Sequence, residues 1–216
     1  MVIPVFPFLI DELGASGSGL VLLVSTAALT EFLFGPIWGS ISDRVGRKPI
    51  LMIGMFGYAL AMFLFGIANQ TWMLIAFRAL SGVLSSATIT TTMAYIGDST
   101  SEKARGSGMG LLGAVAGVGT VIGPGIGGLL AGSSLSTPFF VSSALALVSV
   151  VLVALLLPES LPRQARGTQD RKIKLVHFDE LWHALTGPIG MLLLIAFLAT
   201  FGTSNFEAIF GLYMLN

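Results

Sequence analysis

A short polar break, GSISDRVGRK at Gly39–Lys48, separates two long apolar runs of the sequence. Hydrophobic residues make up 54% of the 216 residues and charged residues only 10%. An ordinary soluble domain has about 25% charged residues. A chain this poor in charge cannot cover a surface that faces water. The sequence therefore indicates an all-α membrane protein, in which short polar breaks join apolar membrane-crossing helices.

Six apolar runs approach or exceed the roughly 20 residues that a helix needs to cross a bilayer. We predict these helices at residues 20–42, 49–68, 71–96, 104–132, 137–157 and 187–212. A shorter apolar piece, Met1–Ile10, precedes them, contains two prolines and lacks the features of a signal peptide. We interpret this piece as the outer end of a first helix, and the chain as a fragment cut within that helix and just after its seventh.

Ten of the 11 basic residues lie in alternate breaks. These residues are Arg44, Arg47 and Lys48, then Lys103 and Arg105, then Arg163, Arg166, Arg171, Lys172 and Lys174. Lys and Arg mark the cytoplasmic side of multi-pass proteins. We therefore expect a multi-pass protein of the inner (plasma) membrane, with residues 43–48, 97–105 and 158–186 in the cytoplasm.

The break at 158–186 is longer than the others and mixed in charge. We predict a cytoplasmic linker that contains an interfacial helix over Ile173–Leu185. This linker divides an N-terminal bundle at 1–157 from the start of a second bundle at 187–216. Such an arrangement is typical of a two-halved transporter.

Composition excludes several other functions. The formal net charge of zero gives no basic surface for nucleic acid. Cysteine is absent, and both histidines, His177 and His183, lie in the linker. No Ser/His/Asp set, thiolate chemistry or His-rich metal site is therefore expected. The sequence predicts neither an enzyme nor a bound metal or cofactor.

Three charged residues lie within predicted helices and away from their ends: Glu31, Arg78 and Glu207. A charge at the bilayer centre costs at least about 2.5–3.5 kcal/mol, so such residues normally face a bundle interior or a wet cavity. We predict that they form a proton-coupled substrate cavity. Two simpler interpretations remain: Arg78 forms a structural pair with a carboxylate, or Glu207 only reaches the outer interface.

The break at Gly39–Lys48 contains a second candidate site. Gly46 permits a tight turn. Asp43 and Arg47 are four residues apart across that turn and need not pair with each other. Asp98 and Arg105 flank the next cytoplasmic break and are available as partners. The alternative is a solvated basic loop that only sets the topology.

The predicted helix at 104–132 is unusually rich in glycine. Gly113 and Gly117, like Gly119 and Gly123, are four residues apart. Small residues at this spacing leave one face bare, so that another helix can approach closely. Pro124 favours a kink. We expect a sliding or bending contact between this helix and a neighbour.

Together these residues resemble the major facilitator superfamily, and within it the bacterial drug:proton antiporters. The signature between helices two and three is carried by Gly39, Asp43, Arg44, Gly46, Arg47 and Lys48. The stretch Arg78–Gly82 resembles the fourth-helix motif of the family. The fifth-helix antiporter motif, which exporters carry, is matched by Gly119, Gly123, Pro124, Gly127 and Gly128. The stretch Asn205–Phe210 resembles the acidic seventh-helix stretch of quinolone and multidrug exporters.

The resemblance implies a six-helix N-terminal bundle followed by the first helix of a C-terminal bundle. It also implies alternating access, with protons as the coupling ion. Arg47 would pair with Asp98 in a conformational latch, while Asp43 would meet a helix of the missing C-terminal half. Arg78 would relay protons, and Glu207 would couple proton binding to drug release. The role of Glu31 stays open.

We expect the full-length parent to export small amphipathic or cationic drugs. An exporter of one metabolite or sugar is the first alternative. A sugar site would need several Asn, Gln or Trp residues within helices, whereas only Asn205 lies deep in one. The second alternative is a non-transporting fragment: a truncated gene product, a folding unit or the partner of another half.

Overall fold

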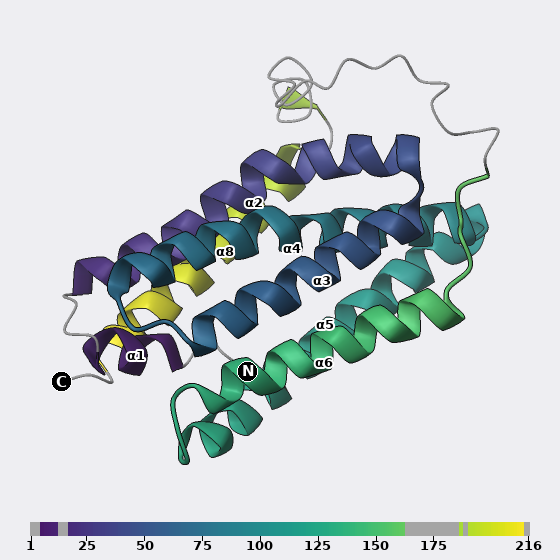
Figure 1. Cartoon of the computed structure of the whole chain (residues 1–216). Helices are drawn as coiled ribbons and strands as arrows, with labels where there is room; N and C mark the ends of the chain where they lie inside the picture. Colours follow the sequence, from purple (N-terminus) through teal and green to yellow (C-terminus); the bar gives the residue numbers. More distant parts are fainter. Residues whose placement is uncertain (1–4, 13–16, 163–185, 188–189, 214–216) are drawn as a thin grey trace.

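The computed structural model describes residues 5–12, 17–162, 186–187 and 190–213 (Figure 1). The helices in chain order are α1 (Phe6–Glu12), α2 (Gly17–Val45), α3 (Arg47–Gly66), α4 (Thr71–Ser99), α5 (Glu102–Ala131), α6 (Thr137–Leu156) and α8 (Gly190–Tyr213). No strand occurs within these ranges. The predicted all-α fold is confirmed, and the six predicted helices match α2 to α6 and α8 to within three residues at each end. The predicted interfacial helix at Ile173–Leu185 lies outside the described residues.

Among the residues that the structure describes, five helices are long and apolar enough to cross a membrane. The qualifying stretches are Val21–Val45, Arg47–Gly66, Thr71–Ser99, Glu102–Ala131 and Thr137–Leu156. In α8, the described side chains form an apolar stretch at Gly190–Asn205. Many large apolar side chains are exposed along these helices, as suits a surface that faces lipid.

Four helices form the packed centre of the described structure. α4 packs against α2 on one side and α3 on the other, and α3 packs in turn against α6 (Figure 1). α5 makes few contacts with α4 and α6, and α8 makes few with α2. The face of α5 that points away from the bundle is therefore open.

An aromatic cluster fixes α1 at one end of the bundle. The Phe6 ring lies 5.4 Å from that of Phe65 on α3 and 5.7 Å from that of Phe139 on α6, measured between centroids. All three rings are buried, and Val5 and Leu9 belong to the same core. The short α1 is thus held by contacts to two membrane-crossing helices rather than by its own length.

Glycines allow α2, α3 and α4 to approach one another closely. A Cβ built on Gly54 would lie 2.6 Å from the Thr88 hydroxyl, and one built on Gly57 would lie 2.5 Å from Leu84. A Cβ built on Gly82 would overlap the Thr30 hydroxyl and lie 2.9 Å from the Ala27 carbonyl oxygen. These positions therefore set the spacing between the central helices.

We expect Gly82→Ala to destabilise the chain by about 1–3 kcal/mol, because the added methyl group meets a backbone oxygen that cannot move aside. The unfolding temperature in detergent, followed by tryptophan fluorescence, should fall by at least about 3 °C. Gly119→Ala is the matched control, since nothing lies within 4 Å of a Cβ built there. Equal unfolding temperatures for the two variants would contradict this packing.

Candidate functional site

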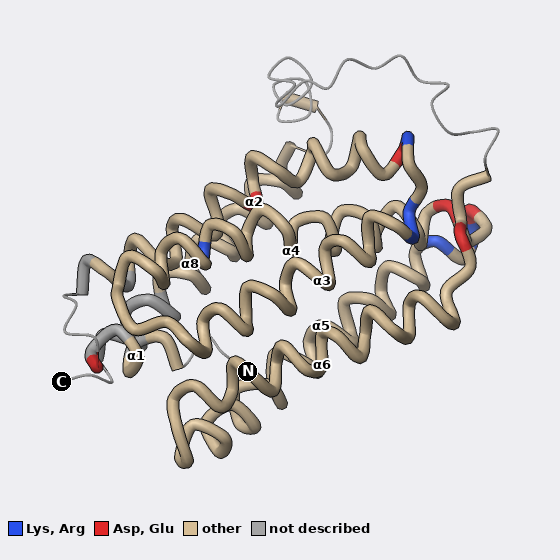
Figure 2. Tube along the Cα trace, viewed as in Figure 1, with Lys and Arg blue, Asp and Glu red and all other residues tan. Residues whose placement is uncertain are grey.

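Most charged residues of the described chain gather at one end of the bundle. Figure 2 shows blue and red segments where α2 meets α3, where α4 meets α5 and where the chain leaves α6. The aromatic cluster around α1 lies at the opposite end (Figure 2). This separation agrees with the alternation of basic and neutral breaks in the sequence.

A one-residue turn joins α2 to α3. α2 continues to Val45 and α3 begins at Arg47, so only Gly46 lies between them. The predicted polar loop at Gly39–Lys48 is therefore helical on both sides of Gly46, which corrects the expectation. Gly46 reverses the chain by itself, because its φ of 122° is readily adopted by glycine but strained for other residues. Its amide donates to the Ser42 carbonyl oxygen (3.0 Å).

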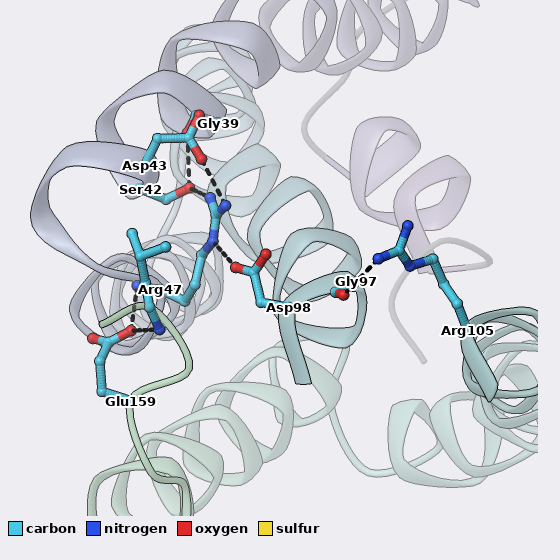
Figure 3. Close-up of polar contacts among 9 residues, drawn as sticks. Gly39, Ser42, Asp43, Arg47, Gly97, Asp98, Arg105 and Glu159 are labelled. Atoms are coloured by element: carbon cyan, nitrogen blue, oxygen red, sulfur yellow. Dashed lines mark hydrogen bonds and ion pairs between the residues drawn. The ribbon is translucent and has the colours of Figure 1, made fainter. Parts of the chain in front are cut away.

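The guanidinium of Arg47 lies at the centre of a polar cluster (Figure 3). Its Nε donates to Oδ2 of Asp98 on α4 (2.8 Å), and its Nη2 pairs with Oδ1 of Asp43 (2.6 Å). Its Nη1 donates to Oγ of Ser42 (2.6 Å). Arg47 is only 7% exposed, so these bonds satisfy a charge that has largely left water.

Part of this cluster was predictable from the sequence. The Arg47–Asp98 pair, implied by the resemblance, is present. The statement that Asp43 and Arg47 need not pair is corrected, because the turn at Gly46 brings the Arg47 side chain back under the last turn of α2. Ser42 was missed, since a lone serine in a polar break carries no distinctive signal.

The end of α6 contributes contacts that the sequence analysis also missed. Oε1 of Glu159 accepts a hydrogen bond from the backbone amide of Arg47 (2.8 Å). Nζ of Lys48 donates to the Ala154 carbonyl oxygen (2.7 Å). The Tyr95 hydroxyl donates to the carbonyl oxygen of Pro158 (3.0 Å). No periodicity predicts bonds between residues more than 60 positions apart.

The other signature residues lie around this cluster. Arg105 forms no ion pair with a described carboxylate; its Nη2 donates to the Gly97 carbonyl oxygen (3.1 Å), next to Asp98 (Figure 3). The Gly39 carbonyl oxygen accepts a bond from the Ser42 hydroxyl (2.8 Å). Arg44 is exposed at the end of α2. The structure therefore brings these residues, taken from α2, α3, α4 and α5, to the same end of the bundle.

The charged residues within the helices are arranged differently from a simple triad. Arg78 on α4 lies over the ring of Phe6, with its Cζ 4.8 Å from the ring centroid. Its Nε is buried and has no hydrogen-bond partner among the described residues. Among the described side chains, no carboxylate forms an ion pair with Arg78. The structural pair considered above is therefore absent from the part of the chain that the structure describes. Glu207 lies in α8, but its side chain is outside the described residues.

Glu31 opens onto a cavity between α2, α3, α4 and α6. The cavity has a volume of about 540 Å³ and is open on one side. Glu31 supplies its carboxylate, and Oε1 accepts a bond from the Ser85 hydroxyl (3.3 Å). The remaining lining mixes hydroxyl and apolar groups: Met55, Tyr58, Thr88, Ile89, Ser142, Leu145, Ala146 and Ser149. Arg78 is not part of this lining.

The glycine-rich helix α5 has two different small-residue faces. Gly123 and Gly127 are buried toward the bundle. On another face, glycines recur at intervals of three and four residues, and no described atom lies within 4 Å of an added Cβ: Gly106, Gly110, Gly113 and Gly117. Gly119 and Gly128 are equally open. α5 runs unbroken through Pro124. We call the face at 106, 110, 113 and 117 the bare stripe.

Comparison with protein families gives a match over the whole chain. The family model described as Major Facilitator Superfamily matches residues 1–216. The chain is 34% identical to Multidrug resistance protein 1 of Bacillus subtilis over 214 residues. It is 28% identical to Quinolone resistance protein NorA of Staphylococcus aureus over 213 residues. Each alignment covers 99% of this chain and 54% of the relative, so the chain spans about half the length of these relatives.

A solved structure supports the fold. The crystal structure of the human organic anion transporter MFSD10 (TETRAN) superposes with a TM-score of 0.62. The match covers 77% of this chain and 37% of that one, at 23% sequence identity. At this identity the likeness shows the arrangement of helices alone.

Proposed function

Because the chain belongs to the Major Facilitator Superfamily, we propose that it acts with a second helical bundle as a proton-coupled exporter of amphipathic or cationic drugs. The observation that carries the proposal is similarity along 99% of the chain to proteins named for multidrug and quinolone resistance. The proposed mechanism is alternating access, in which two bundles rock around a central site. Protons are the coupling ion, and no cofactor is proposed.

The cavity at Glu31 suits a cation that carries an apolar body. A single carboxylate offers charge, while the hydroxyls of Ser85 and Thr88 offer hydrogen bonds that do not fix one ligand geometry. Met55 adds a flexible, polarizable surface that adapts to different shapes. This mixture supports a broad range of drugs more than a sugar, which needs several fixed polar partners.

Proton coupling is proposed for the charged groups within the helices. The buried Nε of Arg78 has no partner within the described part of the chain, so it is a hydrogen-bond donor that a substrate or a protonatable group can satisfy. Glu207 is proposed to exchange a proton for the drug, as the resemblance implies. An ionisable residue within the membrane is a functional candidate by default.

The cluster around Arg47 is proposed as the conformational latch. Its bonds connect the ends of α2 and α4 with the start of α3. A buried charged network has a definite bonded state and loses several bonds together when the helices separate. Such a network suits one of the two conformations of a rocking transporter. We place this end of the bundle in the cytoplasm of an inner (plasma) membrane.

The bare stripe of α5 is proposed as the contact with the second bundle. Glycines at 106, 110, 113 and 117 allow a neighbouring helix backbone to come close. Nothing in the described chain occupies this face. The missing C-terminal half of the transporter is the partner that we propose for it.

Replacing Glu207 by Gln is expected to lower proton-driven ethidium efflux by roughly tenfold, because the amide cannot exchange a proton at this site. The assay uses vesicles that contain this chain together with the C-terminal half of Bacillus subtilis Multidrug resistance protein 1. Glu102→Gln, at the exposed start of α5, is the matched control. Proton-driven export that persists in Glu207→Gln would contradict the coupling role.

The same assay tests the function as a whole. Efflux from the chain with the second half, and none from the chain alone, supports the proposed exporter. Efflux from the chain alone would mean that copies of it assemble into a transporter. No ethidium efflux in either case would favour a narrow metabolite carrier or a non-transporting fragment.

A further inference from the structure

We propose that Glu159 is a positioning residue of the latch: its carboxylate holds the start of α3 so that the Arg47 guanidinium reaches Asp98. Glu159 lies just after α6, where the chain enters the linker. The bond therefore also ties the linker to the latch. This inference rests on the latch role proposed above for Arg47, and its test separates the two.

The first turn of α3 has no cap from its own sequence. Helix N-termini leave backbone amides without intrahelical partners, and a side chain of the N-cap residue usually accepts one of them. Here the N-cap is Gly46, which has no side chain to offer. Oε1 of Glu159 takes the place of an N-cap side chain: it accepts a hydrogen bond from the backbone amide of Arg47 (2.8 Å), although the two residues are 112 positions apart. A carboxylate also suits the positive end of the helix dipole.

Arg47 is consequently held at both ends. Its backbone amide is bound by Glu159, while its guanidinium is bound by Asp98 and Asp43 (Figure 3). Gly46, directly before it, is a flexible joint that cannot hold the backbone in place by itself. Without the bond to Glu159, the first turn of α3 is free to fray. The guanidinium then loses its fixed distance to Asp98, which belongs to another helix.

The segment around Glu159 is fastened to the same place by further bonds. Oε1 of Glu159 also accepts the amide of Leu161 (3.2 Å), which folds the start of the linker around the carboxylate. Tyr95 on α4 binds the Pro158 carbonyl oxygen, and Lys48 on α3 binds the Ala154 carbonyl oxygen. A displacement of the linker is therefore transmitted to α3 and α4 close to the residues that form the latch.

The test measures how often the latch opens in the 216-residue chain reconstituted in liposomes. The chain has no cysteine, so Ile50→Cys introduces a single thiol. Ile50 is 2% exposed and lies one turn along α3 from Arg47. A water-soluble maleimide should label this thiol only when the end of the bundle opens.

In this background, we expect Glu159→Ala to raise the labelling rate about tenfold, the effect of losing one hydrogen bond to a charged group. Glu159→Asp keeps the charge but withdraws the acceptor, so it should also label faster. Glu159→Gln keeps the acceptor oxygen and should stay within threefold of the parent. Glu102→Ala removes an exposed acid at the start of α5 and should leave the rate unchanged.

A double variant distinguishes positioning from simple helix capping. By itself, Asp98→Asn should raise the labelling rate. Adding Glu159→Ala to Asp98→Asn should raise the rate little further, because both substitutions act on the contact between Arg47 and Asp98. The inference would be overturned if the rate increases of the two single variants multiply in the double variant. It would also be overturned if Glu159→Gln is labelled as fast as Glu159→Ala. If Glu159→Ala does not fold, the labelling rate of Glu159→Asp is the test. A Glu159→Asp variant that is labelled at the parent rate would overturn the inference. The Arg47→Ala variant separates the two proposals. If its labelling rate equals that of the parent, the latch itself is contradicted. If Arg47→Ala is labelled fast but Glu159→Ala is labelled as slowly as the parent, only the role of Glu159 is contradicted.

Discussion

Replacing Arg47 by Ala is expected to raise labelling at Ile50→Cys roughly hundredfold and to lower ethidium efflux at least tenfold, with ethidium binding retained. Breaking a buried ion pair costs about 3–5 kcal/mol. The Asp98 side chain is 31% exposed, so water takes over part of its solvation. A cost of about 2–3 kcal/mol remains, which corresponds to the stated factor.

Matched variants show whether the bonds of Arg47 matter or only its charge. Arg47→Lys keeps the charge but cannot bind Asp98, Asp43 and Ser42 at the same time, so it should resemble Arg47→Ala. Lys103→Ala removes an exposed cation from the start of α5 and should behave as the parent. An unchanged transport rate in Arg47→Ala, measured with the second half present, would count against the latch.

Gly117→Leu is expected to abolish ethidium efflux with the second half present, while the chain alone keeps its unfolding temperature. At residue 117 of the bare stripe, no atom of the described residues lies within 4 Å of an added Cβ, so leucine fits there without a clash. A helix of the second bundle that packs on this stripe would meet the new side chain and be pushed away. The loss of function then comes from assembly and not from folding.

Val118→Leu is the control for this prediction. Val118 is the next residue of α5 and is exposed among large apolar side chains such as Leu111 and Val115. That face suits lipid, and one more methylene group there should change neither efflux nor stability. Full efflux from Gly117→Leu would show that the second bundle does not use the bare stripe.

The helices were predictable because the bilayer imposes a simple rule on sequence. A crossing helix needs a continuous apolar run, and a polar break must follow it. Errors of up to three residues occur at helix ends, as at both ends of α2. At Gly39–Lys48 polarity indicated a loop, yet the backbone stays helical up to Val45. Polarity reports exposure to water, and a helix end is also exposed.

The candidate site was predictable in its residues but not in its bonds. Arg47 and Asp98 were paired through the resemblance alone, since spacing does not relate residues on different helices. The Asp43 pair depends on the direction in which Gly46 turns the chain. The bond between Glu159 and the Arg47 amide depends on how α6 packs against α3. Such contacts follow from tertiary structure, which a local sequence pattern does not encode.

The single-residue turn at Gly46 also bears on how this sequence can change during evolution. One inserted residue would rotate α3 by about 100° about its axis relative to α2. Gly54 and Gly57, which now face α4, would then be turned away from it. Residues Gly132–Ser136 between α5 and α6 leave more room for such a change. Descendants of this sequence should therefore accept insertions and deletions at 132–136 and lose those that arise at 46.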